Sequence, residues 1–147
     1  SLILAQAKKA GYTPKYFGCE GMDGILALDG FDASLAEGLM FLTPFTADST
    51  DETTQTFVKA FKKAFNDTPI QFAADAYDCV YTIKAAAEKA KITPDMSASD
   101  ISDALKKSMT EIKIDGLTGK SITWSADGEP TKDPTVVSVE NGAYKID

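Results

Sequence analysis

The side chain best placed to do chemistry in this sequence is the carboxylate of Glu20. It lies between two glycines, Gly18 and Gly21, directly after a predicted strand over residues 15–18. In open α/β sheets, the loops that follow the carboxyl ends of strands line the ligand crevice. A carboxylate in such a loop could hold an ammonium group through a charge-assisted hydrogen bond. The competing interpretation is an acid in a solvated loop, because glutamate is seldom buried.

Two further carboxylates, Asp23 and Asp75, could act with Glu20 as an acid/base pair or as a site for a hard cation. Asp23 follows Glu20 in a glycine-rich loop that lacks the dense Asp/Asn ladder and terminal Glu of a calcium-binding loop. The spacing therefore favours a plain loop-and-cap role for these acids. We predict no metal site and no cofactor.

Composition removes several classes of enzyme and of partner. The sequence contains no His, and all 15 of its basic residues are Lys. It therefore has no imidazole general base, no Ser-His-Asp triad, no His-ligated zinc site and no guanidinium clamp for phosphate. The glycines at 18, 21 and 24 do not form the dinucleotide-binding pattern. A net charge of −7 argues against binding to nucleic acid, where cationic patches supply most of the affinity.

The 147 residues are 44% hydrophobic and 25% charged, which is the balance of an ordinary globular domain. No apolar run approaches the roughly 18 to 20 residues that cross a bilayer. Cys19 and Cys79 would allow one disulfide, but we interpret them as small buried side chains. Apolar residues begin at position 2, with only Ser1 before them, so we expect a helix without a proper start and hence the C-terminal piece of a longer protein.

Hydrophobic periodicity and turn residues predict strands that alternate with helices. Helices are expected over 2–10, over 25–28, over 72–90 and after the capping pair Ser97 and Asp100. Strands are expected over 15–18, 37–42 and 121–124. Another helix carries Phe57, Phe61 and Phe65 four residues apart, a stripe that we expect to pack on a core. The helix over 72–90 should carry an apolar side of its own, made of Ala73, Ala76, Tyr77, Val80, Ile83 and Ala87.

The end of the chain has the pattern of a β-hairpin. Residues 135–139 and 143–146 flank Asn141-Gly142, a strong signal for a two-residue hairpin turn. Strands that alternate with helices, followed by this hairpin, predict an α/β fold with an antiparallel addition at one edge of the sheet.

Seven short motifs follow one another along the chain, and only together are they specific. They are Leu4-x-Gln6-Ala7-x-x-x-Gly11, Phe17-Gly18-Cys19-Glu20-Gly21, Ala36-Glu37-Gly38-Leu39-x-Phe41, Phe57-Val58-x-x-Phe61, Pro69, Ala76-Tyr77-Asp78-x-Val80 and Gly116-x-x-Gly119-x-Ser121-Ile122-Thr123-Trp124-x-x-x-Gly128. In this order they resemble the C-terminal half of the periplasmic-binding-protein type I family. The resemblance is to the branched-chain amino-acid (Leu/Ile/Val-type) receptors of ABC importers.

The resemblance implies a segment of a two-lobed α/β fold that closes on its ligand, with the N-terminal part of the protein absent. It assigns residues 1–44 to part of the second lobe and a crossover strand, residues 45–112 to helices of the first lobe, and residues 113–147 to the terminal crossover and hairpin. A segment of this kind should expose apolar surface and sheet edges, which invites dimerisation or strand exchange.

By the same resemblance, Glu20 falls where the family binds the ligand's α-ammonium group, and Phe72 falls near the pocket for the ligand's apolar side chain. Cys19 and Met22 flank the glutamate and complete the predicted ligand-binding set. The implied protein is a non-enzymatic extracytoplasmic receptor, periplasmic or a cell-surface lipoprotein, that delivers an amino acid to a membrane permease. Two alternatives stay open: a sensory domain of the same fold, and a carboxylate-dependent hydrolase that uses Glu20 with Asp23 or Asp75.

Overall fold

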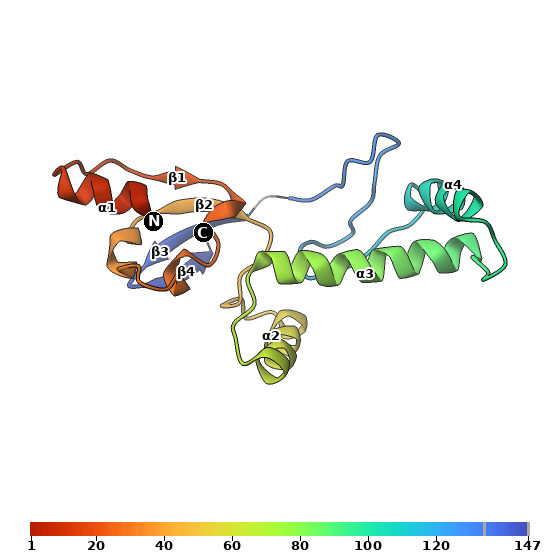
Figure 1. The fold of residues 1–147 in the computed structure, drawn as a ribbon, viewed down its shortest axis with the longest axis horizontal. Helices are drawn as coiled ribbons and strands as arrows, with labels where there is room; N and C mark the ends of the chain where they lie inside the picture. The colour runs from red at the N-terminus through yellow and green to blue at the C-terminus, as the bar shows by residue number, and fades with distance from the viewer. Residues whose placement is uncertain (134, 147) are drawn as a thin grey trace. The chain divides into compact units, whose positions relative to one another are not determined.

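A computed structural model describes residues 1–133 and 135–146 of the chain. The chain forms two compact units (Figure 1). Unit 1 comprises Ser1–Gln71 and Pro134–Asp147, and unit 2 comprises Phe72–Asp133. The predicted assignment of segments to lobes concerns the parent fold, and it stays a prediction.

Unit 1 contains a four-stranded mixed sheet with the order β1-β2-β3-β4. β1 (Phe17–Gly18) and β2 (Met40–Thr43) are parallel, whereas β3 (Thr135–Glu140) and β4 (Ala143–Ile146) complete the sheet in antiparallel fashion. The helices of the unit are α1 (Leu2–Lys9) and α2 (Glu52–Phe65), with 3-10 turns η1 (Glu20–Met22), η2 (Ile25–Ala27) and η3 (Ala33–Ala36). The predicted α/β class and terminal hairpin are confirmed.

The core of unit 1 lies between the sheet and α1. Alternate residues of the central strands, Phe41 of β2 with Val137 and Val139 of β3, are fully buried. Leu4 from α1, Ile25, Ala36 and Leu39 complete this cluster. The ring of Tyr144 packs edge-on against Phe41, with ring centroids 5.5 Å apart.

The hairpin turn has the conformation that its sequence predicts. Asn141 and Gly142 both have positive φ, at 55° and 73°. Two positive φ angles in a two-residue loop are the mark of a type I′ turn, whose twist matches that of the flanking strands. The carboxylate of Glu37, which ends η3, accepts hydrogen bonds from both of these backbone amides and so fastens the turn to the segment that precedes β2.

Unit 2 contains most of α3 (Gln71–Ala90) and all of α4 (Ala98–Met109). The predicted Ser97–Asp100 cap of α4 is confirmed, because the Ser97 hydroxyl oxygen accepts from the Asp100 amide at 3.2 Å. The predicted strand over 121–124 is wrong as an element. Only isolated bridges form there, Ile114 with Ile122 and Trp124 with Pro130.

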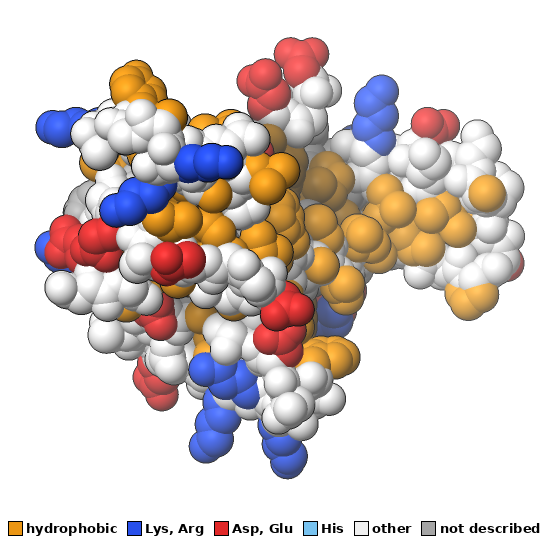
Figure 2. All heavy atoms as spheres, turned by 60° about the vertical axis from the view of Figure 1, so that its left-hand side comes forward, with side chains coloured by type: hydrophobic (Ala, Val, Ile, Leu, Met, Phe, Trp, Pro, Cys, Tyr) orange, Lys and Arg blue, Asp and Glu red, His pale blue; other side chains and the backbone are white. Residues whose placement is uncertain are grey.

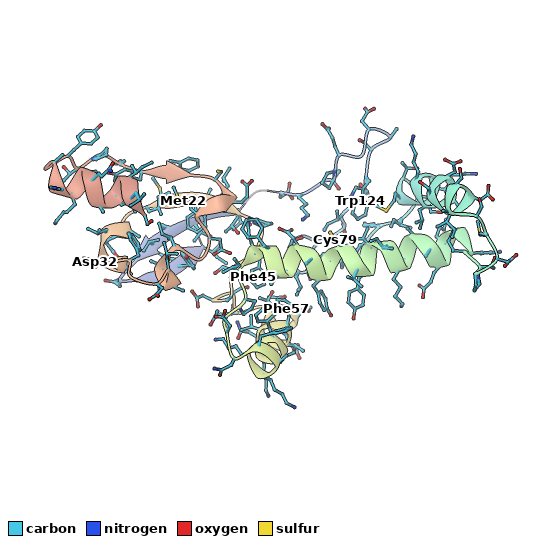
Figure 3. All side chains as sticks on the ribbon, viewed as in Figure 1. Met22, Asp32, Phe45, Phe57, Cys79 and Trp124 are labelled. Atoms are coloured by element: carbon cyan, nitrogen blue, oxygen red, sulfur yellow. The ribbon has the colours of Figure 1, made fainter. Side chains whose placement is uncertain are left out.

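The phenylalanine stripe of α2 does not pack on a core as predicted. Phe57 and Phe61 are half-buried, and Phe65 is 67% exposed. The three rings stack along the helix instead, with centroids 5.9 and 4.6 Å apart, and Phe57 contacts the buried ring of Phe45 (Figure 3). Helical spacing therefore located the stripe correctly, and its Phe57 end contacts the buried Phe45, whereas Phe65 at the other end is mostly exposed.

The apolar side predicted for α3 is largely exposed. Val80 is 66% exposed and Ile83 58%. On the face of the molecule that Figure 2 shows, exposed hydrophobic side chains gather in patches. The buried side of α3 is a different one, with Ala74, Asp78, Thr82 and Ala86 spaced by four residues. The loop at residues 116–118 is bound to Asp78, which decides the side that is covered.

The cysteines also differ from the prediction. Both Cys19 and Cys79 are exposed free thiols and not small buried side chains. Cys79 is an exposed residue of α3, whereas Cys19 belongs to the loop after β1.

Candidate functional site

The loop predicted to bind ligand is a tight turn at the carboxyl end of β1. Cys19 is extended, with φ −113°, and precedes the 3-10 turn η1 that Glu20 opens. The amides of Met22 and Asp23 donate to the carbonyls of Cys19 and Glu20 at 3.0 and 3.1 Å, which fixes the backbone of the turn. The side chain of Glu20 is exposed. A carboxylate is thus presented to solvent from a backbone that is held in place.

Met22 anchors this turn to the protein interior. It is half-buried and packs against the core cluster of unit 1 (Figure 3). A Cβ atom at Gly18 would lie 2.7 Å from the Met22 Cγ atom, so the last residue of β1 has no room for a side chain. The structure brings Cys19, Glu20 and Met22 together in one loop of unit 1.

Asp23 ends the turn and ties it to the start of α3. Its carboxylate accepts hydrogen bonds from the amide of Gln71 at 2.5 Å and from the amide of Gly24 at 2.9 Å. Burial raises the pKa of this carboxyl above its ordinary value, the two amide bonds oppose the shift, and the charge of Asp48 adds to it. Because both carboxylate oxygens already accept from backbone, Asp23 has the cap role that the sequence favoured.

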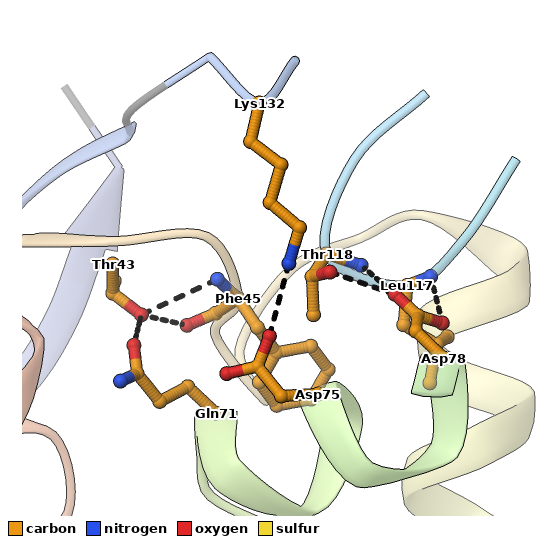
Figure 4. A network of polar contacts seen from close by, with 8 residues as sticks. All are labelled: Thr43, Phe45, Gln71, Asp75, Asp78, Leu117, Thr118 and Lys132. Atoms are coloured by element: carbon orange, nitrogen blue, oxygen red, sulfur yellow. Dashed lines mark hydrogen bonds and ion pairs between the residues drawn. The ribbon is translucent and has the colours of Figure 1, made fainter. Parts of the chain in front are cut away.

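The side chain of Gln71 gives the first turn of α3 a second anchor, in addition to the hydrogen bond from its backbone amide to Asp23. This residue is 1% exposed, and its Oε1 atom accepts a hydrogen bond from the hydroxyl of Thr43 at 2.7 Å (Figure 4). Thr43 is the last residue of β2 and is itself buried. Phe72, the predicted contact for an apolar ligand group, follows Gln71 directly, is 51% exposed and belongs to unit 2.

Two aspartates of unit 2 have structural partners (Figure 4). The carboxylate of Asp75 pairs with Lys132 Nζ at 3.1 Å. Asp78, 7% exposed, accepts from the Leu117 and Thr118 amides at 2.9 Å each and from the Thr118 hydroxyl at 2.7 Å. A Cβ atom on Gly116 would collide with this carboxylate, which explains a glycine at the turn.

A small cavity of about 260 Å³ lies beside the Glu20 turn within unit 1. Asp23, Ile70 and Tyr144 are among its lining residues. The Tyr144 hydroxyl accepts a hydrogen bond from the Gly24 amide at 3.0 Å. Burial raises the pKa of Tyr144, so this hydroxyl stays protonated. Over the residues that the structure describes, no group of three or more His, Cys, Asp or Glu side chains could hold a metal ion.

Comparison with known proteins identifies the family. A sequence model of the periplasmic binding protein family matches residues 1–143. The chain belongs to the periplasmic binding protein family. Among solved structures it is similar to the branched-chain amino acid transporter substrate-binding protein LivJ of Streptococcus pneumoniae, solved in complex with isoleucine. That match has 26% identity and a TM-score of 0.75, and it covers 99% of this chain and 40% of that chain. No match was found among curated protein sequences.

Two more distant receptors share the fold. The leucine binding protein LivK of Thermotoga maritima is 22% identical, with a TM-score of 0.75 over 99% of this chain and 40% of that one. A solute binding protein of an R. palustris ABC transporter, solved in complex with benzoate, is 18% identical, with a TM-score of 0.76 over 98% and 38% of the two chains. The chain spans about 40% of the length of the solved receptors that it matches.

In this segment of a periplasmic binding protein, sequence analysis did not identify the residues that hold the loops in place, namely Gln71, Asp78 and Gly116. Gln71 carried no signal beyond its place before a helix. Asp78 and Gly116 each stood in a family motif, yet only the structure shows that the two motifs meet. No helix in the described part of the chain is long and apolar enough to cross a membrane.

Proposed function

We propose that this chain is the part of an extracytoplasmic solute-binding receptor of an ABC importer that binds the ligand's ammonium group. The observation that carries the proposal is the exposed carboxylate of Glu20, held at the carboxyl end of β1 by a hydrogen-bonded turn. Strand ends of this kind line ligand crevices in α/β folds. Membership of the periplasmic binding protein family supports capture of a small solute.

The charge of Glu20 favours an amino acid over a simple carboxylate. The relatives include a protein solved with isoleucine and one solved with benzoate. An anion such as benzoate would be repelled by an exposed carboxylate in the site, whereas an α-ammonium group would form a charge-assisted hydrogen bond with it. We therefore propose a branched-chain or related amino acid, with Phe72 against its side chain and Cys19 and Met22 flanking Glu20.

In this proposal the parent protein works outside the cytoplasm by lobe closure and passes its ligand to a membrane permease. In it, residues 1–44 supply part of the second lobe and a crossover strand, residues 45–112 supply helices of the first lobe, and residues 113–147 supply the terminal crossover and hairpin. The alternative function is that of a sensory domain of the same fold. A gene neighbourhood without permease and ATPase genes would favour this alternative. The hydrolase alternative has lost support, because the carboxylates of Asp23 and Asp75 are engaged by backbone amides and by Lys132.

The test uses the parent protein that carries this segment, with leucine and its des-amino analogue 4-methylpentanoate as calorimetric ligands. The wild type should bind leucine far more tightly than the analogue, because only leucine offers an ammonium group to Glu20. In Glu20→Gln, affinity for leucine should fall about 10- to 100-fold, the value of a hydrogen bond between charged groups. Affinity for the analogue should stay the same or rise.

Glu129→Gln is the matched control, because Glu129 is an exposed glutamate outside this loop. It should leave both affinities unchanged. An unaltered preference for leucine in Glu20→Gln would overturn the assignment of Glu20. The absence of any thermal or calorimetric response across the amino acids and related metabolites would overturn the transport function itself.

A further inference from the structure

The carboxylate of Glu20 has no side-chain contact that holds it in place. The side chain is exposed, and its oxygens make no hydrogen bond or ion pair with the residues that the structure describes. The place of this charge therefore depends on the backbone of the turn that carries it. A group that recognises a ligand needs supporting contacts that fix its geometry. For Glu20, those contacts are made by other residues of the turn.

Two hydrogen bonds inside the turn fix the backbone around Glu20. They run from the Met22 amide to the Cys19 carbonyl and from the Asp23 amide to the Glu20 carbonyl. These bonds shape the turn but do not join it to another segment of unit 1. Met22 supplies apolar packing against the core, and the side chain of Asp23 supplies a hydrogen bond to a distant segment. Hydrogen bonds are directional, whereas apolar packing is not, so Asp23 is the more exact attachment.

Asp23 joins the turn to the first residue of α3. One carboxylate oxygen accepts from the Gln71 amide at 2.5 Å, and the other accepts from the Gly24 amide at 2.9 Å. The Gly24 amide also donates to the Tyr144 hydroxyl at 3.0 Å, so it keeps an acceptor when Asp23 is replaced. The Gln71 amide has no second acceptor among the described residues. The bond that depends on Asp23 alone is therefore the bond to Gln71.

Gln71 is itself well anchored. Its side chain is 1% exposed, and its Oε1 atom accepts from the Thr43 hydroxyl at 2.7 Å (Figure 4). Thr43 is buried and is the last residue of β2, a central strand of the sheet. The Glu20 turn after β1 is thus tied, through Asp23 and Gln71, to the carboxyl end of the neighbouring parallel strand.

We propose that Asp23 is a positioning residue for ligand selectivity, which holds the Glu20 carboxylate where it can bind an ammonium group. This inference rests on the proposed function, because it takes Glu20 as the ammonium contact. The effect of Asp23 passes through the turn. Loss of its bond to Gln71 should therefore weaken the contact with an ammonium group and leave the apolar contacts of the ligand in place.

The first measurement needs no ligand and follows hydrogen exchange of the 147-residue chain by NMR. In Asp23→Ala, the protection factors of the amides at positions 22 and 23 should fall at least about tenfold, because the turn opens more often. In Asp23→Asn they should stay within about threefold of the wild type. The asparagine oxygen still accepts from Gln71, and the Gly24 amide keeps the Tyr144 hydroxyl.

The second measurement is calorimetry on the parent protein, with leucine and its des-amino analogue 4-methylpentanoate. Asp23→Ala should lower the affinity for leucine at least about tenfold and leave the affinity for the analogue within about threefold. Asp23→Asn should retain most of the preference for leucine, because it keeps the acceptor. This conservative variant also separates positioning from a direct action of the Asp23 charge on the ligand.

Asp78→Ala is the matched control for a loss of stability. Asp78 is a carboxylate of unit 2 that also accepts from backbone amides, those of Leu117 and Thr118. Its replacement should lower the melting temperature but leave both the protection of the Glu20 turn and the preference for leucine unchanged. A residue that served stability alone would behave like Asp78 in both measurements.

Each contrary result has a distinct meaning. Unchanged protection of the turn in Asp23→Ala would overturn the positioning role. Equal losses of leucine affinity in Asp23→Ala and Asp23→Asn would overturn it in favour of a direct effect of charge. Equal losses for leucine and the analogue, or a lost preference in Asp78→Ala as well, would also overturn it. If Glu20→Gln lowers the preference and Asp23→Ala does not, this inference fails alone. If Glu20→Gln leaves the preference unaltered, the assignment of Glu20 in the proposed function fails, and the inference fails with it.

Discussion

The carboxylate of Asp23 accepts a hydrogen bond from the backbone amide of Gln71, 48 positions along the chain, at 2.5 Å. The bond joins the turn that carries Glu20 to the first residue of α3. Asp23 and Gln71 both belong to unit 1, and the side chain of Asp23 is half-buried. The geometry of the Glu20 turn therefore depends on a carboxylate whose two oxygens both accept hydrogen bonds from backbone amides.

We first predict the effect of removing this acceptor. Asp23→Ala should lower the free energy of unfolding by about 1–3 kcal/mol, because the amides of Gln71 and Gly24 lose their partner. Asp23→Asn keeps an acceptor oxygen and should cost much less at neutral pH, since it also removes a desolvated charge. Urea unfolding at about pH 7 measures both. Equal losses in the two variants would show that the charge, and not the acceptor, holds the turn.

The pH dependence of the same pair follows from the raised pKa of Asp23. A carboxyl whose pKa is raised by folding stabilises the native state when protonated. That contribution is complete below the ordinary pKa of an aspartate and is lost as the pH rises through the raised value. Between about pH 3 and pH 7, wild type should therefore lose stability relative to Asp23→Asn. A difference that stays constant across this interval would contradict the burial argument.

The Asp78 carboxylate should be the most sensitive polar group of unit 2. Three donors from Leu117 and Thr118 converge on it in a buried setting, so Asp78→Ala should lower the free energy of unfolding by about 2–4 kcal/mol. Gly116→Ala should act in the same direction through collision with Asp78. The control is Asp103→Ala, at an exposed position of α4. Thermal and urea unfolding followed by circular dichroism check the order of the three variants.

The exposed side of α3 predicts self-association. Val80 and Ile83 stand next to each other on this helix surface and are mostly exposed. Burial of such side chains between copies of the chain is favourable by about 25 cal/mol per Å². Sedimentation velocity should show a concentration-dependent dimer that Val80→Lys with Ile83→Lys abolishes. The control Leu28→Lys changes an exposed apolar residue of unit 1 and should leave it intact. A wild type that stays monomeric at high concentration contradicts this prediction.

What the sequence predicted well was encoded locally. The Asn141-Gly142 turn, the Ser97 cap and the extent of α3 follow from neighbouring residues and appear as expected. What it missed depends on partners far along the chain. Hydrophobic spacing identified an apolar side of α3, but the loop bound to Asp78 decides which side is covered. The cysteines were predicted to be buried because free cysteine is usually a buried residue, and that general tendency does not hold for Cys19 and Cys79, which are both exposed.

The same distinction between local and long-range features holds for the residues of the candidate site. The position of Glu20 at a strand end could be predicted, since strand, glycines and acid are adjacent in sequence. The contact of Gln71 with both Asp23 and Thr43 could not, because no local pattern connects a helix start to two distant segments. A residue that presents its own side chain at a candidate site is therefore easier to find in a sequence than the residues that hold it in position.

The last prediction concerns affinity in the 147-residue chain itself. Small-molecule sites gain affinity by enclosing most of the ligand surface, commonly 70–90%. Here the Glu20 side chain and the Cys19 thiol are exposed, and Phe72 is 51% exposed. Leucine should accordingly bind this chain at least about 100-fold more weakly than it binds the parent receptor, because a single charge-assisted contact supplies only part of the binding free energy. Calorimetry on the two proteins in the same buffer measures the ratio, and Glu20→Gln should abolish the residual binding in the short chain. Submicromolar binding by the short chain would mean that these residues enclose the ligand without a second lobe.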